Sequence, residues 1–145
     1  MWYGEYQHTL DDKERFILPA KFREKLKTLD KKTLFVTYGF EGCLAFYPEA
    51  TWREIETKVS SIPFTKKEGR NFSRLFYGGA CEVEIDSQGR ITLSERYKKF
   101  AQIKREIVII GIGNRIEIWD KTRWDEFCRE NKERFEEIAE DLFDG

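Results

Sequence analysis

The sequence predicts one α+β domain with internal pseudo-two-fold symmetry, and two observations lead to that prediction. Two stretches are alike, LDDKERFILPAKFRE at 10–24 and IDSQGRITLSERYKK at 85–99. Each has an aliphatic residue, an Asp, three residues, an Arg and a hydrophobic run that becomes basic. A length of 145 residues also favours one compact core. We therefore expect a single domain over 1–145, in which each half supplies half of the structure.

The repeated unit continues beyond these two stretches. TLFVTYG at 33–39 corresponds to EIVIIGI at 106–112, and LAFYPEATWREIE at 44–56 corresponds to IEIWDKTRWDEFC at 116–128. Two copies of so long a unit are not a solenoid. The chain then divides into a first half at 4–59, a linker helix at 60–78, a second half at 79–135 and an acidic C-terminal tail at 136–145.

Each half is expected to fold as β-turn-β-α-β-β-α. Alternating apolar and polar residues predict a strand before Asp11 and another before Asp86, and an Asp that opens a turn accepts backbone N–H bonds. Pro19 stands where the next helix starts, and Ser94 is the N-cap at the matching position. The expected strands are 5–11, 15–18, 34–39, 81–86, 90–93 and 107–111, and the expected helices are 20–27, 95–101 and the segments after Pro48 and Asp120.

The linker is expected to contain a helix at 65–76. Thr65 would be its N-cap, and Glu68 three residues later would complete a capping box.

Composition and motifs argue against catalysis, cofactors and membrane insertion. The one histidine, His8, lies in a predicted strand, and Cys43, Cys81 and Cys128 are widely spaced, without a metal-ligand pattern. The glycine-containing stretches match neither a P-loop nor a dinucleotide-binding fingerprint. No apolar run is long enough to cross a membrane, and no secretory signal is present. We expect a cytoplasmic protein that is not an enzyme, with no cofactor, no metal and no small-molecule substrate.

Charge is distributed unevenly along the chain, although the formal net charge is only −1. Residues 1–105 contain 20 basic and 15 acidic side chains, whereas residues 106–145 contain 6 basic and 12 acidic ones. A basic body with an acidic end is compatible with binding to a polyanion despite the neutral total.

The Asp and the Arg of the repeated motif have two interpretations. An Asp four residues before an Arg can form a bidentate ion pair that fixes a tight turn, which explains Asp11 with Arg15 and Asp86 with Arg90. The same turns can also present donors outward, because Arg suits guanine O6 and N7 whereas Lys and Gln suit phosphates and other base edges. Four nearby lysines are equally well explained as solvated helix faces: Lys25, Lys27, Lys98 and Lys99.

Three motifs occur in order over nearly the whole chain: GEYQHTLDDKERFILPAKFRE, GGACEVEIDSQGRITL and GNRIEIWDKTRW. In this combination the sequence resembles the MraZ family, bacterial regulators of the division and cell-wall gene cluster. That family is similar to the AbrB/MazE-like (SpoVT-AbrB) DNA-binding domains, in which two half-units interlock. The resemblance therefore implies a swapped-hairpin β-barrel with peripheral helices, built here from one chain.

The resemblance also implies which residues bind DNA. The turns would face double-stranded promoter DNA, with Asp11 and Asp86 fixing them, and the contacts would come from Lys13, Arg15, Gln88 and Arg90. The family forms closed rings, so we expect a homo-oligomer, an octamer or dodecamer, that is nucleoid-associated, binds short direct repeats and represses transcription.

The sequence departs from the family pattern at both turns. Glu14 replaces a usual Gly and Gln88 an expected Lys, and both changes lower the positive charge of the turns. Ser94 replaces a Pro that usually starts the helix.

A second function stays open at this point. The chain could be a protein-binding module of the antitoxin type, in which the acidic segment from Trp124 to the C-terminus wraps a basic partner. Alternatively, that segment is a surface helix whose apolar residues pack on the barrel or on a neighbouring subunit: Trp124, Phe127, Phe135 and Ile138. Steep salt dependence of DNA binding would separate the DNA-binding hypothesis from the protein-binding one.

Overall fold

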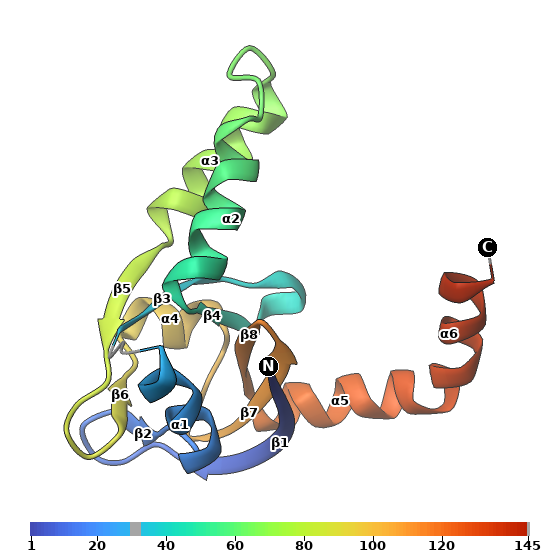
Figure 1. The fold of residues 1–145 in the computed structure, drawn as a ribbon. Helices are drawn as coiled ribbons and strands as arrows, with labels where there is room; N and C mark the ends of the chain where they lie inside the picture. Colours follow the sequence, from blue (N-terminus) through green and yellow to red (C-terminus); the bar gives the residue numbers. More distant parts are fainter. Residues whose placement is uncertain (30–32, 145) are drawn as a thin grey trace.

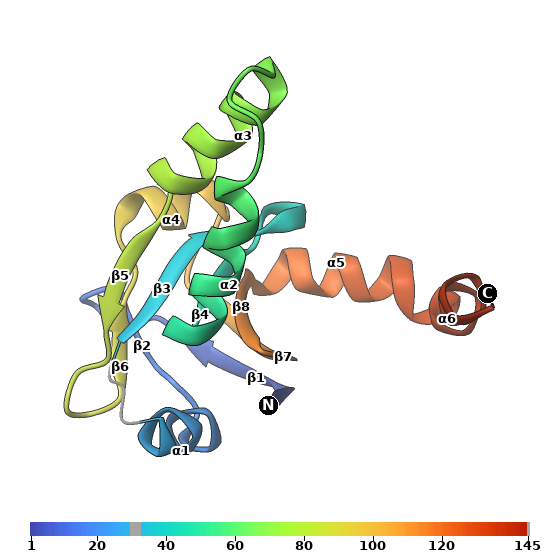
Figure 2. The ribbon, with the colours of Figure 1, turned by 45° about the horizontal axis from the view of Figure 1, so that its top comes forward.

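The computed structural model describes residues 1–29 and 33–144 and shows an α+β fold on an antiparallel sheet (Figures 1 and 2). The strands are β1 (Trp2–Thr9), β2 (Arg15–Ile17), β3 (Thr33–Tyr38), β4 (Leu44–Tyr47), β5 (Cys81–Glu84), β6 (Arg90–Thr92), β7 (Glu106–Gly113) and β8 (Arg115–Asp120). The helices are α1 (Ala20–Thr28), α2 (Glu49–Ser60), α3 (Lys67–Gly78), α4 (Glu95–Phe100), α5 (Lys121–Asn131) and α6 (Phe135–Phe143), with 3-10 turns η1 (Phe40–Gly42) and η2 (Lys132–Arg134).

The sheet combines strands of both halves symmetrically. Its order is β1-β7-β8-β4-β3-β5, and β2 pairs with β6 in a separate two-stranded ladder. In the sequence repeat, β1 to β4 correspond to β5 to β8, so exchanging corresponding strands maps the sheet order onto itself. The first strand of each half pairs with the third strand of the other, β1 with β7 and β5 with β3. Neither half can therefore complete the sheet alone.

The prediction of a closed barrel is wrong, because the six-stranded sheet stays open in the described part of the chain. Its edges are β1 and β5, which pair only with β7 and β3. The strands that would have to close the barrel, β2 and β6, are three residues long and bond to each other instead. The swapped-hairpin topology stays a prediction, as do the boundaries of the two halves.

One hydrophobic core joins the sheet, the β2–β6 ladder and the helices α1 and α4. The ladder contributes Phe16 and Ile91, at 2% and 1% exposure, and the helices contribute Phe22 and Tyr97. Phe16 meets Phe46 of β4 edge to face, with ring centroids 6.4 Å apart. Each fully buried side chain of this kind contributes about 1.5–3 kcal/mol. The core thus anchors the ladder to the sheet.

The helix starts agree with the sequence in most cases. α1, α2 and α4 begin directly after Pro19, Pro48 and Ser94, although the Ser94 hydroxyl makes no capping bond to the described residues. Asp120 caps α5 through a bond from the backbone N–H of Arg123 at 3.3 Å.

The capping box expected at Thr65 is wrong. A turn with a bond from the N–H of Lys66 to the carbonyl of Pro63 precedes α3. The helix therefore begins at Lys67, with Lys66 as its N-cap.

The C-terminal segment only partly follows the expectation that its apolar face packs on the sheet. Trp124 and Phe127 of α5 do so, contacting Trp119 of β8 with ring centroids 5.3 Å away in each case. The chain then turns, and α6 lies at the far end of α5, away from the sheet (Figures 1 and 2). Phe135 is 76% exposed there. Phe135 therefore does not pack on the sheet of its own chain, because α5 directs α6 away from the sheet.

Candidate functional site

The first signature turn follows β1 and is held by Asp11. Oδ1 of Asp11 accepts hydrogen bonds from the backbone N–H groups of Lys13 and Arg15, each at 2.9 Å, and Oδ2 accepts one from Arg15 Nε at 2.8 Å. Backbone bonds from Asp11 N to the Arg15 carbonyl and from Glu14 N to the Asp11 carbonyl close the turn. One carboxylate therefore fixes both the backbone and the guanidinium.

The second turn repeats this geometry around Asp86. Its Oδ1 accepts from the N–H groups of Gln88 at 2.9 Å and Arg90 at 2.8 Å, and its Oδ2 accepts from Arg90 Nε at 2.7 Å. Bonds from Asp86 N to the Arg90 carbonyl and from Gly89 N to the Asp86 carbonyl complete it. The same set of hydrogen bonds is thus present at both turns.

The ion pairs differ from the expected bidentate pairs. Because backbone N–H groups take one carboxylate oxygen, each guanidinium contacts the other oxygen through Nε. Within the described residues, neither Arg15 nor Arg90 makes a further hydrogen bond through its terminal NH₂ groups. Their side chains are 23% and 26% exposed. Both guanidinium groups therefore keep donors available to a ligand.

These bonds stabilise the ionised form of both carboxyl groups. At Asp11, loss of hydration acts to raise the pKa, but the N–H and guanidinium of Arg15 and the N–H of Lys13 outweigh it and hold the pKa below its usual value of 3.8. At Asp86, the N–H of Arg90 has the largest influence and the pKa is likewise lowered. Both groups are carboxylates at neutral pH.

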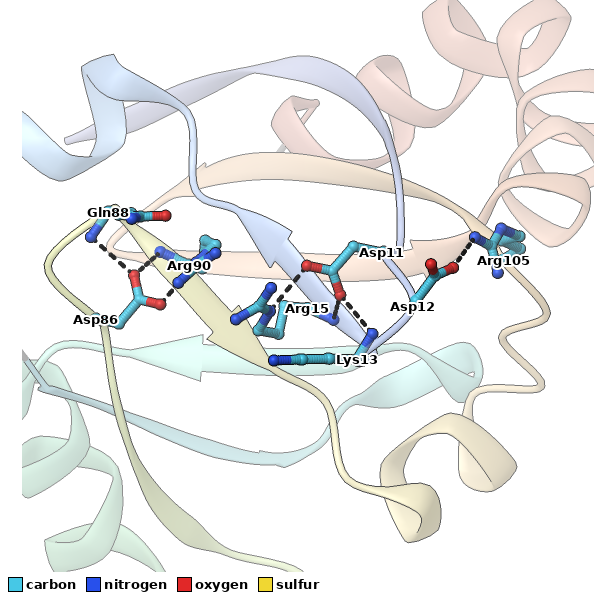
Figure 3. Close-up of polar contacts among 8 residues, drawn as sticks. All are labelled: Asp11, Asp12, Lys13, Arg15, Asp86, Gln88, Arg90 and Arg105. Carbon is cyan, nitrogen blue, oxygen red and sulfur yellow. Dashed lines mark hydrogen bonds and ion pairs between the residues drawn. The ribbon is translucent and has the colours of Figure 1, made fainter.

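The β2–β6 ladder brings the two turns together on one surface, as Figure 3 shows. Arg15 lies opposite Thr92 and Arg90 lies opposite Ile17, with the buried pair of Phe16 and Ile91 between them. Successive residues of a strand face opposite sides, so both Arg residues lie on the outward face. Diagonal neighbours of this kind lie about 7–8 Å apart. A pair of turns 75 residues apart in sequence thus forms one site.

Each turn is also contacted by a basic residue from the other half. Lys98 of α4 forms an ion pair with Glu14 of the first turn, 2.6 Å from Nζ to Oε2. Arg23 of α1 lies against Gly89 of the second turn and donates to the Leu18 carbonyl at 3.0 Å. Sequence reasoning missed these contacts and left Lys98 as an equal candidate for a solvated helix face. The signal was present, because Arg23 and Lys98 occupy matching positions of the repeat.

The remaining expected contact residues lie where a ligand can reach them. Lys13 and Gln88 are both exposed at the tips of the two turns, at equivalent positions of the motif. Beside the first turn, Asp12 accepts from Arg105 at 3.2 Å, a largely exposed ion pair that stabilises little. The surface therefore offers guanidinium, ammonium and amide donors together.

Catalytic chemistry finds little support in the site. Burial, and then Glu117, raise the pKa of the fully buried Cys43 thiol, so it is not a thiolate nucleophile. No group of His, Cys, Asp and Glu able to hold a metal is found within residues 1–29 and 33–144. No helix in the described part of the chain is long and apolar enough to cross a membrane.

Comparisons with known proteins agree with the duplicated architecture. The model of the family described as "MraZ protein, putative antitoxin-like" matches the chain twice, at residues 1–75 and 76–145. A transcriptional regulator MraZ of Lactobacillus delbrueckii subsp. bulgaricus is 51% identical over 144 residues, which cover 99% of this chain and 98% of the relative. A transcriptional regulator MraZ of Moorella thermoacetica is 44% identical over 144 residues, which cover 99% of this chain and 98% of the relative.

The duplicated fold and its paired Asp–Arg turns, together with relatives named for their role, define a protein of the transcriptional-regulator class. The two family matches and the near-complete coverage make the assignment specific. The chain belongs to the MraZ family.

Proposed function

We propose that the chain is a sequence-specific DNA-binding repressor, that the two paired turns contact promoter DNA, and that it acts on the division and cell-wall gene cluster. The observation that carries the proposal is the register of β2 against β6, in which Arg15 and Arg90 are diagonal neighbours on the outward face. Their free NH₂ groups are suited to guanine O6 and N7 or to phosphates. Asp11 and Asp86 hold each guanidinium in place before DNA arrives.

The proposal includes a ring-shaped homo-oligomer on DNA that carries short direct repeats. The two turns have little positive charge of their own, because DDKER at 11–15 contains three acids and two bases and DSQGR at 86–90 one of each. Many copies of the surface acting together would offset the weak attraction of one copy, since linked sites raise the effective concentration.

Fluorescence anisotropy tests the DNA-binding proposal. The wild type, Arg15→Ala and Arg90→Ala are titrated with a duplex from upstream of the protein's own gene and with a scrambled duplex. We expect preference for the upstream duplex, and a loss of about 1–3 kcal/mol in each variant if its Arg contacts a base. Lys13→Ala should weaken both duplexes alike and flatten the salt dependence, as expected for a phosphate contact.

Two controls make the outcome decisive. Arg53→Ala removes an exposed Arg of α2, distant in sequence from both turns, and should leave binding unchanged. Circular dichroism must show both turn variants folded. Equal binding of the wild type to both duplexes at low and at physiological salt would contradict the proposal and favour a protein partner.

A further inference from the structure

An apolar groove lies between the α2–α3 hairpin, the sheet and α5. It encloses about 840 Å³ and is lined on α3 by Phe72, Leu75 and Phe76, with Phe40 and Phe100 also contributing. Leu75 is 65% exposed and Phe40 is 76% exposed. The groove is open to solvent, and exposed apolar surfaces of this kind commonly mark sites of interaction with a partner.

A second apolar surface lies on α6, at the other end of the molecule. Its apolar residues recur with the spacing of one helix face: Phe135, Ile138, Ala139, Leu142 and Phe143. Leu142 and Phe143 are 74% and 86% exposed. A short helix with such an apolar stripe is stable mainly when the stripe is buried. In its own chain Ile138 and Ala139 are half-buried, whereas Phe135, Leu142 and Phe143 stay exposed.

The helix α6 does not fill the groove of its own chain. The aromatic contacts of Trp124 and Phe127 with Trp119 fix α5, and α5 directs α6 away from the sheet (Figures 1 and 2). The groove and the stripe are therefore two unlike surfaces on one chain that cannot meet within it.

Charge also makes the two surfaces complementary. The segment 66–78, which includes α3, carries Lys66, Lys67, Arg70 and Arg74 against one acid, a net of +3. The segment 135–145, which includes α6, carries five acids and no base, a net of −5. Opposite charge favours this pairing over contact of two α6 helices with each other, where like charges would meet.

We propose that α6 of one subunit docks in the groove of the next, so that a second copy of this chain is the partner. The apolar stripe lies in the groove and the acidic face lies toward the basic residues of α3. A contact between unlike surfaces is head to tail and forms a ring when the rotation closes. The inference rests on the oligomer of the proposed function and names the two surfaces that build it.

Light scattering coupled to size exclusion tests the proposal on the full chain. One variant changes the stripe, Leu142→Gln with Phe143→Gln, and its matched control changes the neighbouring acids, Glu140→Gln with Asp141→Gln. Another variant changes the groove, Leu75→Glu, with Asn71→Glu of the same helix as its control. The substituted positions are exposed, so circular dichroism should show each variant folded.

We expect the wild type to run as a large oligomer and the stripe and groove variants to run as monomers. The Asn71→Glu control should stay oligomeric, and the acid control should also assemble, with weaker salt dependence. Mixing the two monomeric variants tests directly whether the stripe of one chain binds the groove of another. One intact groove then meets one intact stripe, so a one-to-one heterodimer should form and go no further.

Three results would overturn the proposal. These are a monomeric wild type, a groove variant that keeps its oligomer, and a mixture of variants that stays monomeric. Binding of a single-repeat duplex is measured in parallel by anisotropy. An oligomer of the expected kind without DNA preference would refute the proposed function and leave the docking intact, so the two failures are distinguishable.

Discussion

At the scale of single residues, each signature Asp has two tasks. One oxygen of Asp11 holds the backbone of the turn and the other holds the Arg15 guanidinium, and Asp86 repeats this with Arg90. The structural and the DNA-binding interpretations of the motif are therefore compatible, because an Arg held through Nε makes no further bond through its terminal NH₂ groups to the described residues.

Replacing Asp11 by Ala should lower the melting temperature by several degrees, and Lys13→Ala should leave it nearly unchanged. The Asp11 carboxylate accepts three hydrogen bonds in the turn, whereas the Lys13 side chain is exposed at the tip. Thermal denaturation followed by circular dichroism measures both. Equal shifts would contradict the turn-fixing role.

The lowered pKa values of Asp11 and Asp86 predict loss of stability in acid. Because their folded-state pKa lies below the usual 3.8, both carboxylates stabilise the fold above that pH. The contribution is lost as the pH falls through the folded-state pKa. The double variant Asp11→Asn, Asp86→Asn should therefore show a flatter dependence of melting temperature on pH below about 4. Parallel profiles for the two proteins would argue against the ion pairs.

The two copies of the turn differ at Glu14, which corresponds to Gly89 in the second turn. It adopts a φ of 61°, in the left-handed region, where the second turn has Gly89 at 80°. The ion pair with Lys98 accompanies this strained position. A non-glycine residue there costs about 1–2 kcal/mol of backbone strain.

Two substitutions separate charge from strain at this position. Glu14→Gln should raise DNA affinity without stabilising the fold, because it removes an acid and frees Lys98. Glu14→Gly should raise affinity and also relieve strain, with a net gain of about 1 kcal/mol or less after the cost of the more flexible unfolded chain. Anisotropy and chemical denaturation measure the two effects. A fall in affinity for both variants would mean that the Lys98 pair orients the turn for DNA.

At the scale of elements, the register of β2 against β6 determines which residues of the ladder face outward. Phe16 is 2% exposed and faces the core, whereas its neighbour Ile17 is 46% exposed on the same surface as the two Arg residues. A shift by one residue would exchange these faces and bury the guanidinium groups.

Adjacent alanine substitutions test this register. Phe16→Ala should cost about 3–5 kcal/mol of unfolding free energy, as expected for a buried aromatic side chain. Ile17→Ala should cost less than about 1 kcal/mol, since a surface change seldom costs more. Urea denaturation measures both. Similar costs for the two variants would mean that the strand does not present the face described.

Much of the local structure was predictable from the repeat, and the long-range arrangement was not. Proline and Asp at Pro19, Pro48 and Asp120 mark helix starts because their preferences act within one turn of chain. The predicted cap at Thr65 was wrong because a turn from Pro63 to Lys66 occupies this segment. The open sheet depends on which strands of one half pair with strands of the other, and no local pattern in the sequence determines that. The cross-contacts of Lys98 and Arg23 depend on the same pairing.

At the scale of the whole molecule, duplication places two copies of the turn on one surface of one chain. The exchange of strands between halves makes that surface inseparable from the fold, since neither half has a complete sheet. In the proposed assembly, α6 would repeat this surface in further copies of the chain.

Assembly should appear as avidity for repeated DNA. The wild type should bind a duplex with two direct repeats about 100-fold or more tighter than one with a single repeat, because the second contact is intramolecular. The monomeric stripe variant, Leu142→Gln with Phe143→Gln, should bind both duplexes alike. Anisotropy at physiological salt measures this ratio. If the variant kept the same ratio of affinities for the two duplexes, the avidity for repeated DNA would not depend on α6.

Site-specific photocrosslinking to the upstream duplex tests whether the two paired turns contact DNA. A benzophenone amino acid replaces Asp12 or Ser87, which are exposed and occupy equivalent positions of the two turns, or Thr57 of α2 as a control. We expect crosslinks to DNA from both turn positions and none from the control. A bound duplex that crosslinks from Thr57 alone, or from neither turn, would contradict the claim that the paired turns are the DNA-binding surface.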